Sequence, residues 1–135
     1  MGRAGPVKYL LDTHAVLWIA ENSSRLSGAV ARLVQAHPAT DFGVAAITAL
    51  EIARLGRAGE VDLKPSPAEW LEDMPHRFSI LPLTPTIAWS CVSLEWAHKD
   101  PADRLICATA LEHKLTLITN DKEITRWGGV PVFWQ

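Results

Sequence analysis

The stretch Leu115-Thr116-Leu117-Ile118-Thr119, followed at once by Asn120-Asp121, is the clearest indication of the fold. A short apolar run that ends in polar turn-forming residues is typical of a buried strand. Val7 to Leu11, closed by Asp12, has the same form near the start of the chain. Both stretches therefore predict a strand with an aspartate at or just beyond its carboxyl end.

The rest of the chain alternates between the two kinds of element. Further strands are expected at Phe42 to Ala46, Phe78 to Leu83 and, at an edge of the sheet, Val130 to Trp134. Helix starts are expected at Thr13, after Ser27, at the capping-box pattern Thr48-Ala49-Leu50-Glu51, after Ser66, after Thr84 and after Asp100. The helix after Thr84 is expected to carry Ile87, Cys91, Leu94 and Trp96. Strands that alternate with helices indicate an α/β fold: a three-layer αβα domain with a central, mainly parallel sheet.

Length and composition fit a single domain over residues 1–135. The chain is 48% hydrophobic and 21% charged, which is ordinary for a globular protein. Its formal net charge of −2 excludes nucleic-acid binding through overall basicity, so any such contact has to be local. Neither a signal peptide nor a membrane span is expected, and Cys91 and Cys107 are read as buried, reduced thiols, so a cytoplasmic location is expected.

Four acidic residues are predicted to approach one another at the carboxyl edge of the sheet. Asp12 and Asp121 lie at strand ends, and Glu51 lies in the first turn of the helix that follows a strand. Asp103 also lies in a first turn, but its helix follows another helix, so topology alone does not place it there. Converging carboxylates repel one another unless they bind a cation or hold a proton. Ligands that are all oxygen suit Mg²⁺ or Mn²⁺ better than zinc, and such ions assist hydrolysis of phosphate esters.

Each acid also has a structural explanation. Glu51 could complete the capping box of Thr48, Asp103 could do the same for Asp100, and aspartate is a common turn residue after a strand. Helix capping does not explain why all four acids should share one edge, so the joint pattern favours a site.

These residues occur in four motifs that resemble PIN domains, and more narrowly the VapC-type toxins of bacterial type II toxin–antitoxin systems. The resemblance runs from about Lys8 to Trp134. The motifs are Leu11-Asp12-Thr13-His14-Ala15-Val16-Leu17-Trp18, Thr48 with Glu51, His98-Lys99-Asp100-Pro101-Ala102-Asp103-Arg104-Leu105-Ile106-Cys107-Ala108-Thr109-Ala110, and Leu117-Ile118-Thr119-Asn120-Asp121.

The resemblance implies an endoribonuclease that requires Mg²⁺ or Mn²⁺, cleaves single-stranded regions of RNA and is neutralised by a small VapB-like antitoxin. It also implies a homodimer, often within a toxin–antitoxin hetero-oligomer. The residues that match the catalytic and metal-binding positions are Asp12, Glu51, Asp103 and Asp121. Auxiliary positions are matched by Asp100, Thr119, Thr48 and His14. Thr48 stands where the family often has Ser, and Ala102 where the subgroup often has Phe.

Other residues have two competing interpretations. Arg54, Arg57 and Lys64 could line an RNA groove or simply form a solvated surface, and Arg104 could contact phosphate. His14 could act in the site or pack beside its own helix. The tryptophans could stack on bases, although Trp18, Trp89 and Trp96 are read as core or interface residues in apolar helices.

Two other functions are considered. One is a catalytically silent binding module with the same fold, against which the complete set of four acids argues. The other is a phosphotransfer enzyme with Asp12 as nucleophile, but the second aspartate usual in such enzymes is replaced here by His14.

Overall fold

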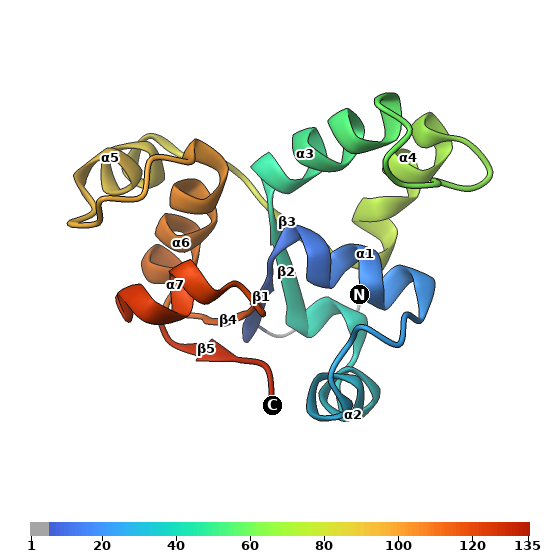
Figure 1. The fold of residues 1–135 in the computed structure, drawn as a ribbon, viewed down its shortest axis with the longest axis horizontal. Coiled ribbons are helices and arrows are strands. Elements are labelled where there is room, and N and C mark those ends of the chain that lie inside the picture. Colours follow the sequence, from blue (N-terminus) through green and yellow to red (C-terminus); the bar gives the residue numbers. More distant parts are fainter. Residues whose placement is uncertain (1–5) are drawn as a thin grey trace.

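A five-stranded parallel sheet forms the centre of the protein, as seen in a computed structural model that describes residues 6–135 (Figure 1). Residues 1–5, which belong to the segment expected to lack a signal peptide, lie outside the described part. The strands are β1 (Tyr9–Leu11), β2 (Phe42–Ala45), β3 (Ser79–Leu81), β4 (Thr116–Ile118) and β5 (Val132–Phe133). The helices are α1 (Thr13–Glu21), α2 (Gly28–Ala36), α3 (Ala46–Arg57), α4 (Pro67–Arg77), α5 (Pro85–Ser93), α6 (Pro101–His113) and α7 (Lys122–Trp127), with a short 3₁₀ turn at Ala39–Asp41.

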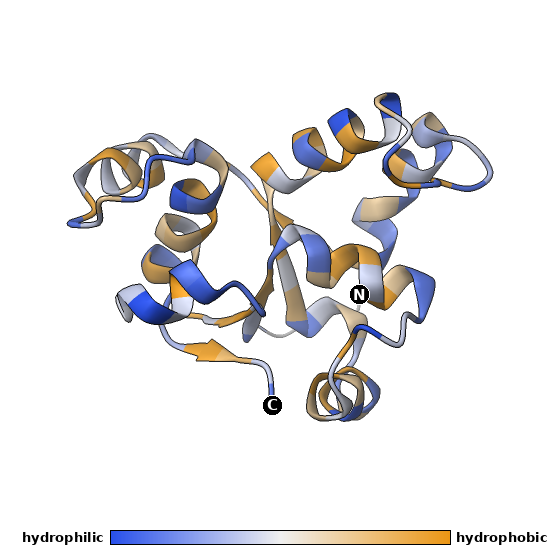
Figure 2. Ribbon diagram, in the orientation of Figure 1, coloured by the Kyte–Doolittle hydropathy of each residue, from blue (hydrophilic) through white to orange (hydrophobic). Residues whose placement is uncertain are grey.

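The helices cover both faces of the sheet, with α1 to α4 on one side and α5 to α7 on the other (Figure 1). Successive residues of each strand point to opposite faces, so Leu11 and Ile118 pack with α1, α2 and α3 while Leu10 and Leu117 pack with α6 and α7. β5 is hydrophobic, and along the covering helices hydrophobic residues alternate with hydrophilic ones (Figure 2). The predicted three-layer αβα fold is confirmed.

The strand order β3-β2-β1-β4-β5 places the ends of β1 and β4 side by side. Leu10 is in register with Gly43 on one side and Leu117 on the other. The chain builds the sheet outward from β1 in one direction and then returns to add β4 on the other side. The crevice at such a reversal, beyond the carboxyl ends of the strands, is the usual ligand-binding position in a parallel sheet.

Five of the six expected helix starts agree with the structure, and the first of these is α1, which begins at Thr13. Ser27, Ser66, Thr84 and Asp100 each cap a helix through their side-chain oxygen, and three of those helices begin with proline. β5 lies at the edge, as expected. The strands are shorter than predicted because apolar residues beyond the ladder are buried without pairing, as Phe78 and Leu115 are.

Two expectations about helices were wrong, and one helix was missed. The capping box at Thr48 does not exist, because α3 already begins at Ala46, directly after β2, and Thr48 lies buried inside it. Glu51 is the sixth residue of α3 and therefore lies in its second turn, not in its first as expected. Leu94 and Trp96 both lie beyond α5, which ends at Ser93, and Trp96 stacks on Trp127 with ring centroids 4.5 Å apart. The short helix α7 was not expected at all, because its six residues provide too little periodicity to recognise.

Candidate active site

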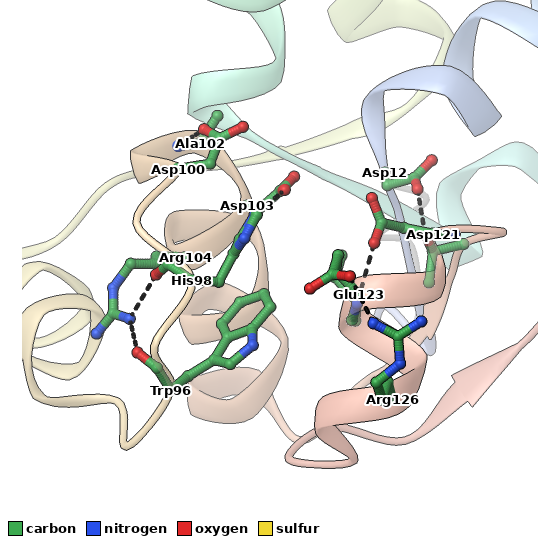
Figure 3. A network of polar contacts seen from close by, with 12 residues as sticks. Asp12, Trp96, His98, Asp100, Ala102, Asp103, Arg104, Asp121, Glu123 and Arg126 are labelled. Carbon is green, nitrogen blue, oxygen red and sulfur yellow. Dashed lines mark hydrogen bonds and ion pairs between the residues drawn. The ribbon is translucent and has the colours of Figure 1, made fainter.

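Six acids line one cavity of about 680 Å³ at the carboxyl edge of the sheet. They are Asp12, Glu51, Glu60, Asp100, Asp103 and Asp121, of which Glu60 was not predicted. Figure 3 shows Asp100 and Asp103, at the start of α6, facing Asp12 and Asp121 across an open space. The structure therefore brings the four predicted catalytic acids and the auxiliary Asp100 to the same cavity.

Asp12 and Asp121 are fixed by the helices that they cap. Asp12 Oδ1 accepts a hydrogen bond of 2.8 Å from the backbone N–H of Ala15, and Asp121 Oδ1 accepts one of 3.0 Å from Ile124. A carboxylate at a helix N-terminus is also favoured by the helix dipole. The helix-capping and site interpretations of these two acids are thus compatible, because capping holds each carboxylate in place at the cavity wall.

Thr119 connects the two strand-end acids. Its hydroxyl donates a hydrogen bond to Asp12 Oδ2 and accepts one of 3.0 Å from the backbone N–H of Asp121. The side chain is almost fully buried, so both bonds are shielded from water. The auxiliary position predicted for Thr119 therefore lies between Asp12 and Asp121.

Glu51 is held by a residue that the sequence analysis did not single out. The Thr13 hydroxyl, in the first turn of α1, donates a hydrogen bond of 2.7 Å to Glu51 Oε1. The same hydroxyl lies 3.3 Å from the buried hydroxyl of Thr48. Thr48 therefore supports the Thr13–Glu51 contact from beneath rather than capping α3, and Thr13 could have been suspected from its place next to Asp12.

Asp103 has a histidine partner that was also missed. His98 Nε2 lies 2.7 Å from Asp103 Oδ2, and the ring of His98 packs on that of Trp96. One ligand atom from each of His98, Asp100 and Asp103 lies within 4.8 Å of the others. The signal for His98 was its position in the same motif as the two aspartates.

Burial and mutual repulsion raise the pKa of two of the acids. Burial is the main reason that the pKa of Asp12 lies above its usual value, against the lowering effect of Thr119. Burial also raises the pKa of Asp103, helped by the charges of Asp100 and Asp121 and opposed by His98. The hydrogen bond to Asp103 raises the pKa of His98. Burial, followed by the nearby acids, raises the pKa of the Cys107 thiol to about 12, so that thiol stays protonated.

The predicted basic residues fall into three different places. Arg54 and Arg57, on the last turns of α3, line the acidic cavity. Lys64 does not; it lines a different pocket and pairs with Asp62 at 3.3 Å. Arg104 points away from the acids (Figure 3). Its guanidinium donates hydrogen bonds of 2.7–3.2 Å to the carbonyls of Cys91, Leu94, Trp96 and His98.

His14 lies at the rim of the same cavity and packs against Trp18, with ring centroids 5.7 Å apart. Of the described cysteines, Cys91 and Cys107 are both free and buried in helices, as expected. No helix among residues 6–135 combines the length and apolar character needed to cross a bilayer.

The donor set of the cavity fits a hard divalent cation. Six carboxylates and the imidazole of His14 line the cavity, and His98 lies beside Asp100 and Asp103. Thiols take no part, because both cysteines are buried in helices. Mg²⁺ and Mn²⁺ prefer such oxygen ligands. The raised pKa values of Asp12 and Asp103 come first from burial and then from neighbouring carboxylates, and a bound cation would offset both effects.

Comparison with known proteins gives a consistent result. The model of the PIN domain family matches residues 9–130. Ribonuclease VapC22 of Mycobacterium tuberculosis is 34% identical over 116 residues, which cover 85% of this chain and 88% of that protein.

Solved structures give the same fold. A toxin–antitoxin complex from Klebsiella pneumoniae contains a chain with a TM-score of 0.67 and 24% identity, covering 93% of this chain and 96% of that one. VapBC2 from Rickettsia felis, solved bound to a promoter DNA fragment, gives a TM-score of 0.68 at 18% identity, covering 96% of this chain and 100% of the other.

Proposed function

Because the chain belongs to the PIN domain family, and is a VapC-type ribonuclease, we propose that it is an endoribonuclease toxin that hydrolyses single-stranded RNA with Mg²⁺ or Mn²⁺. The observation that carries this proposal is the cavity in which Asp12, Glu51, Asp103 and Asp121 meet. A binding module without catalysis would not need four converging carboxylates, which cost free energy when no cation is bound.

Each acid has a role that follows from how it is held. Asp12 and Asp121, which are held in place by Thr119 and by the helices that they cap, would bind a metal ion in the cavity. Asp103 on α6 and Glu51 on α3 line the same cavity and would complete the ligand set. A metal bound there would lower the pKa of a water and neutralise charge on the scissile phosphate. Asp100 adds negative charge at the rim.

Asp12 is better placed as a ligand than as a nucleophile. One of its oxygens accepts from the backbone of Ala15 and the other from the hydroxyl of Thr119. Both bonds hold the carboxylate still and reduce its basicity, whereas attack on phosphorus requires a free oxygen with room to move. This geometry disfavours the phosphotransfer alternative.

Arg54 and Arg57 are proposed to contact the RNA backbone. They are exposed, they follow Glu51 on α3, and they line the same cavity as the acids. The overall negative charge of the chain makes such local cations necessary for a polyanionic substrate. Arg104 is not included in this proposal, because four carbonyls already occupy four of its five N–H groups.

Cleavage of a labelled single-stranded RNA by purified protein tests the activity. We expect cleavage with Mg²⁺ or Mn²⁺ and none in excess EDTA. Glu51→Gln and Asp121→Asn should each abolish it. Glu123→Gln is the matched control, since Glu123 lies two residues after Asp121 but pairs with Arg126 at 2.6 Å and lines no part of the cavity (Figure 3).

Three results would contradict the proposal. Cleavage that persists in chelator would exclude the metal mechanism. Cleavage by Glu51→Gln at the wild-type rate would exclude the acid set. Absence of cleavage in wild type and control, with RNA still bound, would favour the silent binding module.

A small antitoxin that inserts a basic residue into the cavity is proposed as partner. The related chains from Klebsiella pneumoniae and Rickettsia felis come from toxin–antitoxin assemblies. A cluster of carboxylates provides a negative field that Arg or Lys neutralises. Co-expression with the neighbouring small reading frame should recover a stable complex without nuclease activity, and a harmless protein that is recovered reproducibly alone would contradict the partner.

A cytoplasmic homodimer is proposed as the form of the toxin. Trp89 and Val92 on α5 are 73% and 69% exposed, which is unusual for large apolar side chains and is consistent with a covered surface. Trp89→Glu should shift the protein from dimer to monomer in sedimentation. A wild-type protein that sediments as a monomer would contradict the dimer.

A further inference from the structure

A second, smaller pocket adjoins the acidic cavity. It has a volume of about 250 Å³ and is lined by Asp12, His14, Trp18, Arg25, Asn120 and Asp121. Asp12, His14 and Asp121 also line the acidic cavity, so the two hollows share a wall that contains two of the proposed metal ligands. We call the smaller hollow the α1 pocket.

An aromatic wall closes the α1 pocket on one side. Trp18 follows His14 by one turn of α1, and their rings are tilted by 47°. Trp18 is half-buried, and its ring packs edge-on against Trp134 with centroids 5.7 Å apart. The Ser27 hydroxyl donates a hydrogen bond to the carbonyl of Trp134, which ties this end of the chain to the start of α2. Trp18 is therefore braced from behind, and part of its surface remains open to the pocket.

Polar groups of a particular kind surround this wall. Arg25 and Asn120 are both exposed. The loop that carries Arg25 is turned by a hydrogen bond of 3.1 Å from the Arg25 N–H to Ser23 Oγ. A guanidinium and a carboxamide are the side chains that pair most readily with the edges of nucleobases. An aromatic face with hydrogen-bonding groups at its margin matches a nucleobase better than an aliphatic ligand.

We propose that the α1 pocket binds the nucleobase of the nucleotide next to the scissile phosphate, with the base stacked on Trp18. This inference rests on the proposed ribonuclease activity. A phosphate held over Asp12 and Asp121 lies at the wall that the two hollows share, so the base linked to it through one sugar can reach the pocket. The remainder of the strand then follows the acidic cavity toward Arg54 and Arg57.

Binding of two labelled oligonucleotides separates the base contact from the phosphate contact. One is a single-stranded hexaribonucleotide of mixed sequence, and the other is an abasic strand of the same length. Affinities are measured by fluorescence anisotropy with Ca²⁺ in place of Mg²⁺, so that binding is followed without cleavage. Stacking of one base on an aromatic ring changes affinity by about 5- to 150-fold.

Wild type is expected to bind the hexaribonucleotide more tightly than the abasic strand. Trp18→Leu should weaken the affinity for the hexaribonucleotide by about 5- to 150-fold and leave the affinity for the abasic strand unchanged. Leucine keeps an apolar side chain against Trp134 but removes the flat face. Trp70→Leu is the matched control, because Trp70 is also half-buried but lines a pocket that contains none of the proposed catalytic acids. Its two affinities should equal those of wild type.

Arg25→Ala tests the pocket without touching its packed wall. It should reduce the ratio of the affinity for the hexaribonucleotide to the affinity for the abasic strand. Arg32→Ala, which removes an exposed arginine on α2, should leave this ratio unchanged. If neither Trp18→Leu nor Arg25→Ala reduces this affinity ratio, and wild type still cleaves RNA, the pocket assignment is wrong and the ribonuclease proposal stands. If the base-dependent preference is present but no RNA is cleaved with Mg²⁺ or Mn²⁺, the ribonuclease proposal fails and the pocket remains a base-binding site.

Discussion

His98 Nε2 lies 2.7 Å from Asp103 Oδ2 and joins the loop after α5 to the first turn of α6. The loop is held by Arg104, the residue that follows Asp103, which donates a hydrogen bond of 3.0 Å to the carbonyl of His98. Asp103 and Arg104 therefore face opposite ways, one toward the acidic cavity and one into the loop that supplies its partner (Figure 3).

Replacing Asp103 by asparagine separates a site role from a capping role. A carboxylate that only interacts with the dipole at the helix N-terminus contributes about 0.3–1 kcal/mol to the free energy of unfolding, so its loss should destabilise the protein. A carboxylate crowded by Asp100 and Asp121 instead repels its neighbours, by up to several kcal/mol at contact distance. We expect metal-free Asp103→Asn to melt at the same temperature as wild type or higher, to lose cleavage, and to gain less stability from Mg²⁺ or Mn²⁺.

Asp100→Asn is the control for that experiment, since asparagine caps a helix about as well as aspartate, and it should change the melting temperature little. An Asp103→Asn protein that melts clearly earlier without metal and still cleaves RNA would show that Asp103 is only a cap.

The stability difference between Asp103→Asn and wild type should depend on pH. Because the pKa of His98 is raised above 6.5 by Asp103, its protonation stabilises wild type below 6.5, and this contribution is lost as the pH rises through the folded-state pKa. The pKa of Asp103 is raised above 3.8, so its charged form costs stability at every pH above that raised value. Between about pH 6 and about pH 8.5 the His98 contribution is the one that changes, so the advantage of Asp103→Asn over metal-free wild type is larger at about pH 8.5 than at about pH 6.

Urea unfolding at the two pH values measures this difference. When both proteins also carry His98→Ala, the difference in their free energy of unfolding should change little between about pH 6 and about pH 8.5. An advantage that grows as the pH falls would show that the charged His98–Asp103 pair is not formed.

Thr119→Val removes the hydroxyl that connects Asp12 to the backbone of Asp121. Leaving buried hydrogen-bonding groups without a partner typically costs about 1–3 kcal/mol. We expect a loss of that size in urea unfolding, together with a large fall in cleavage and in the stabilisation by Mn²⁺, because Asp12 Oδ2 loses its partner and the carboxylate keeps only the bond from Ala15 to Oδ1. Thr109→Val is matched in burial and also loses a hydrogen bond, to Leu105 in α6, but should leave cleavage and the response to Mn²⁺ intact. Equal effects of both variants on cleavage would contradict a positioning role for Thr119.

Arg104→Ala removes the donor of four hydrogen bonds to backbone carbonyls. Bonds to a charged group contribute about 1.5–3 kcal/mol each and are not additive, so a loss on the order of 3 kcal/mol is expected in urea unfolding. Arg104→Lys should recover only part of it, because an ammonium cannot reproduce the planar fork. Arg126→Ala, which breaks an exposed pair with Glu123, should cost less than about 1 kcal/mol. Near-wild-type stability with weaker RNA binding in Arg104→Ala would instead favour the phosphate contact.

The sequence by itself predicted the five strands, six of the seven helices, the family and the four acids that line the cavity. Each strand and each capped helix is recognised from a pattern among neighbouring residues, so the sequence alone can predict it. The alternation of the two kinds of element then predicts a parallel sheet. The ends of β1 and β4 carry Asp12 and Asp121, and a parallel sheet places those ends along one edge. Where local patterns were weak or misleading, as for α7 and for the start of α3, the predictions failed.

Only the tertiary structure decided which partner each site residue has. The contacts between Thr13 and Glu51, and between Thr119 and Asp12, join residues 38 and 107 positions apart. Such pairs have no signature in the local sequence, because they exist only after the sheet has brought distant segments together. The same holds for Arg104. Its position next to Asp103 suggested a phosphate contact, but its side chain points from α6 toward the loop between α5 and α6 and donates to the carbonyls of Trp96 and His98. Spacing along the chain predicts which face or edge a residue occupies, and packing between elements then sets the partner of its side chain.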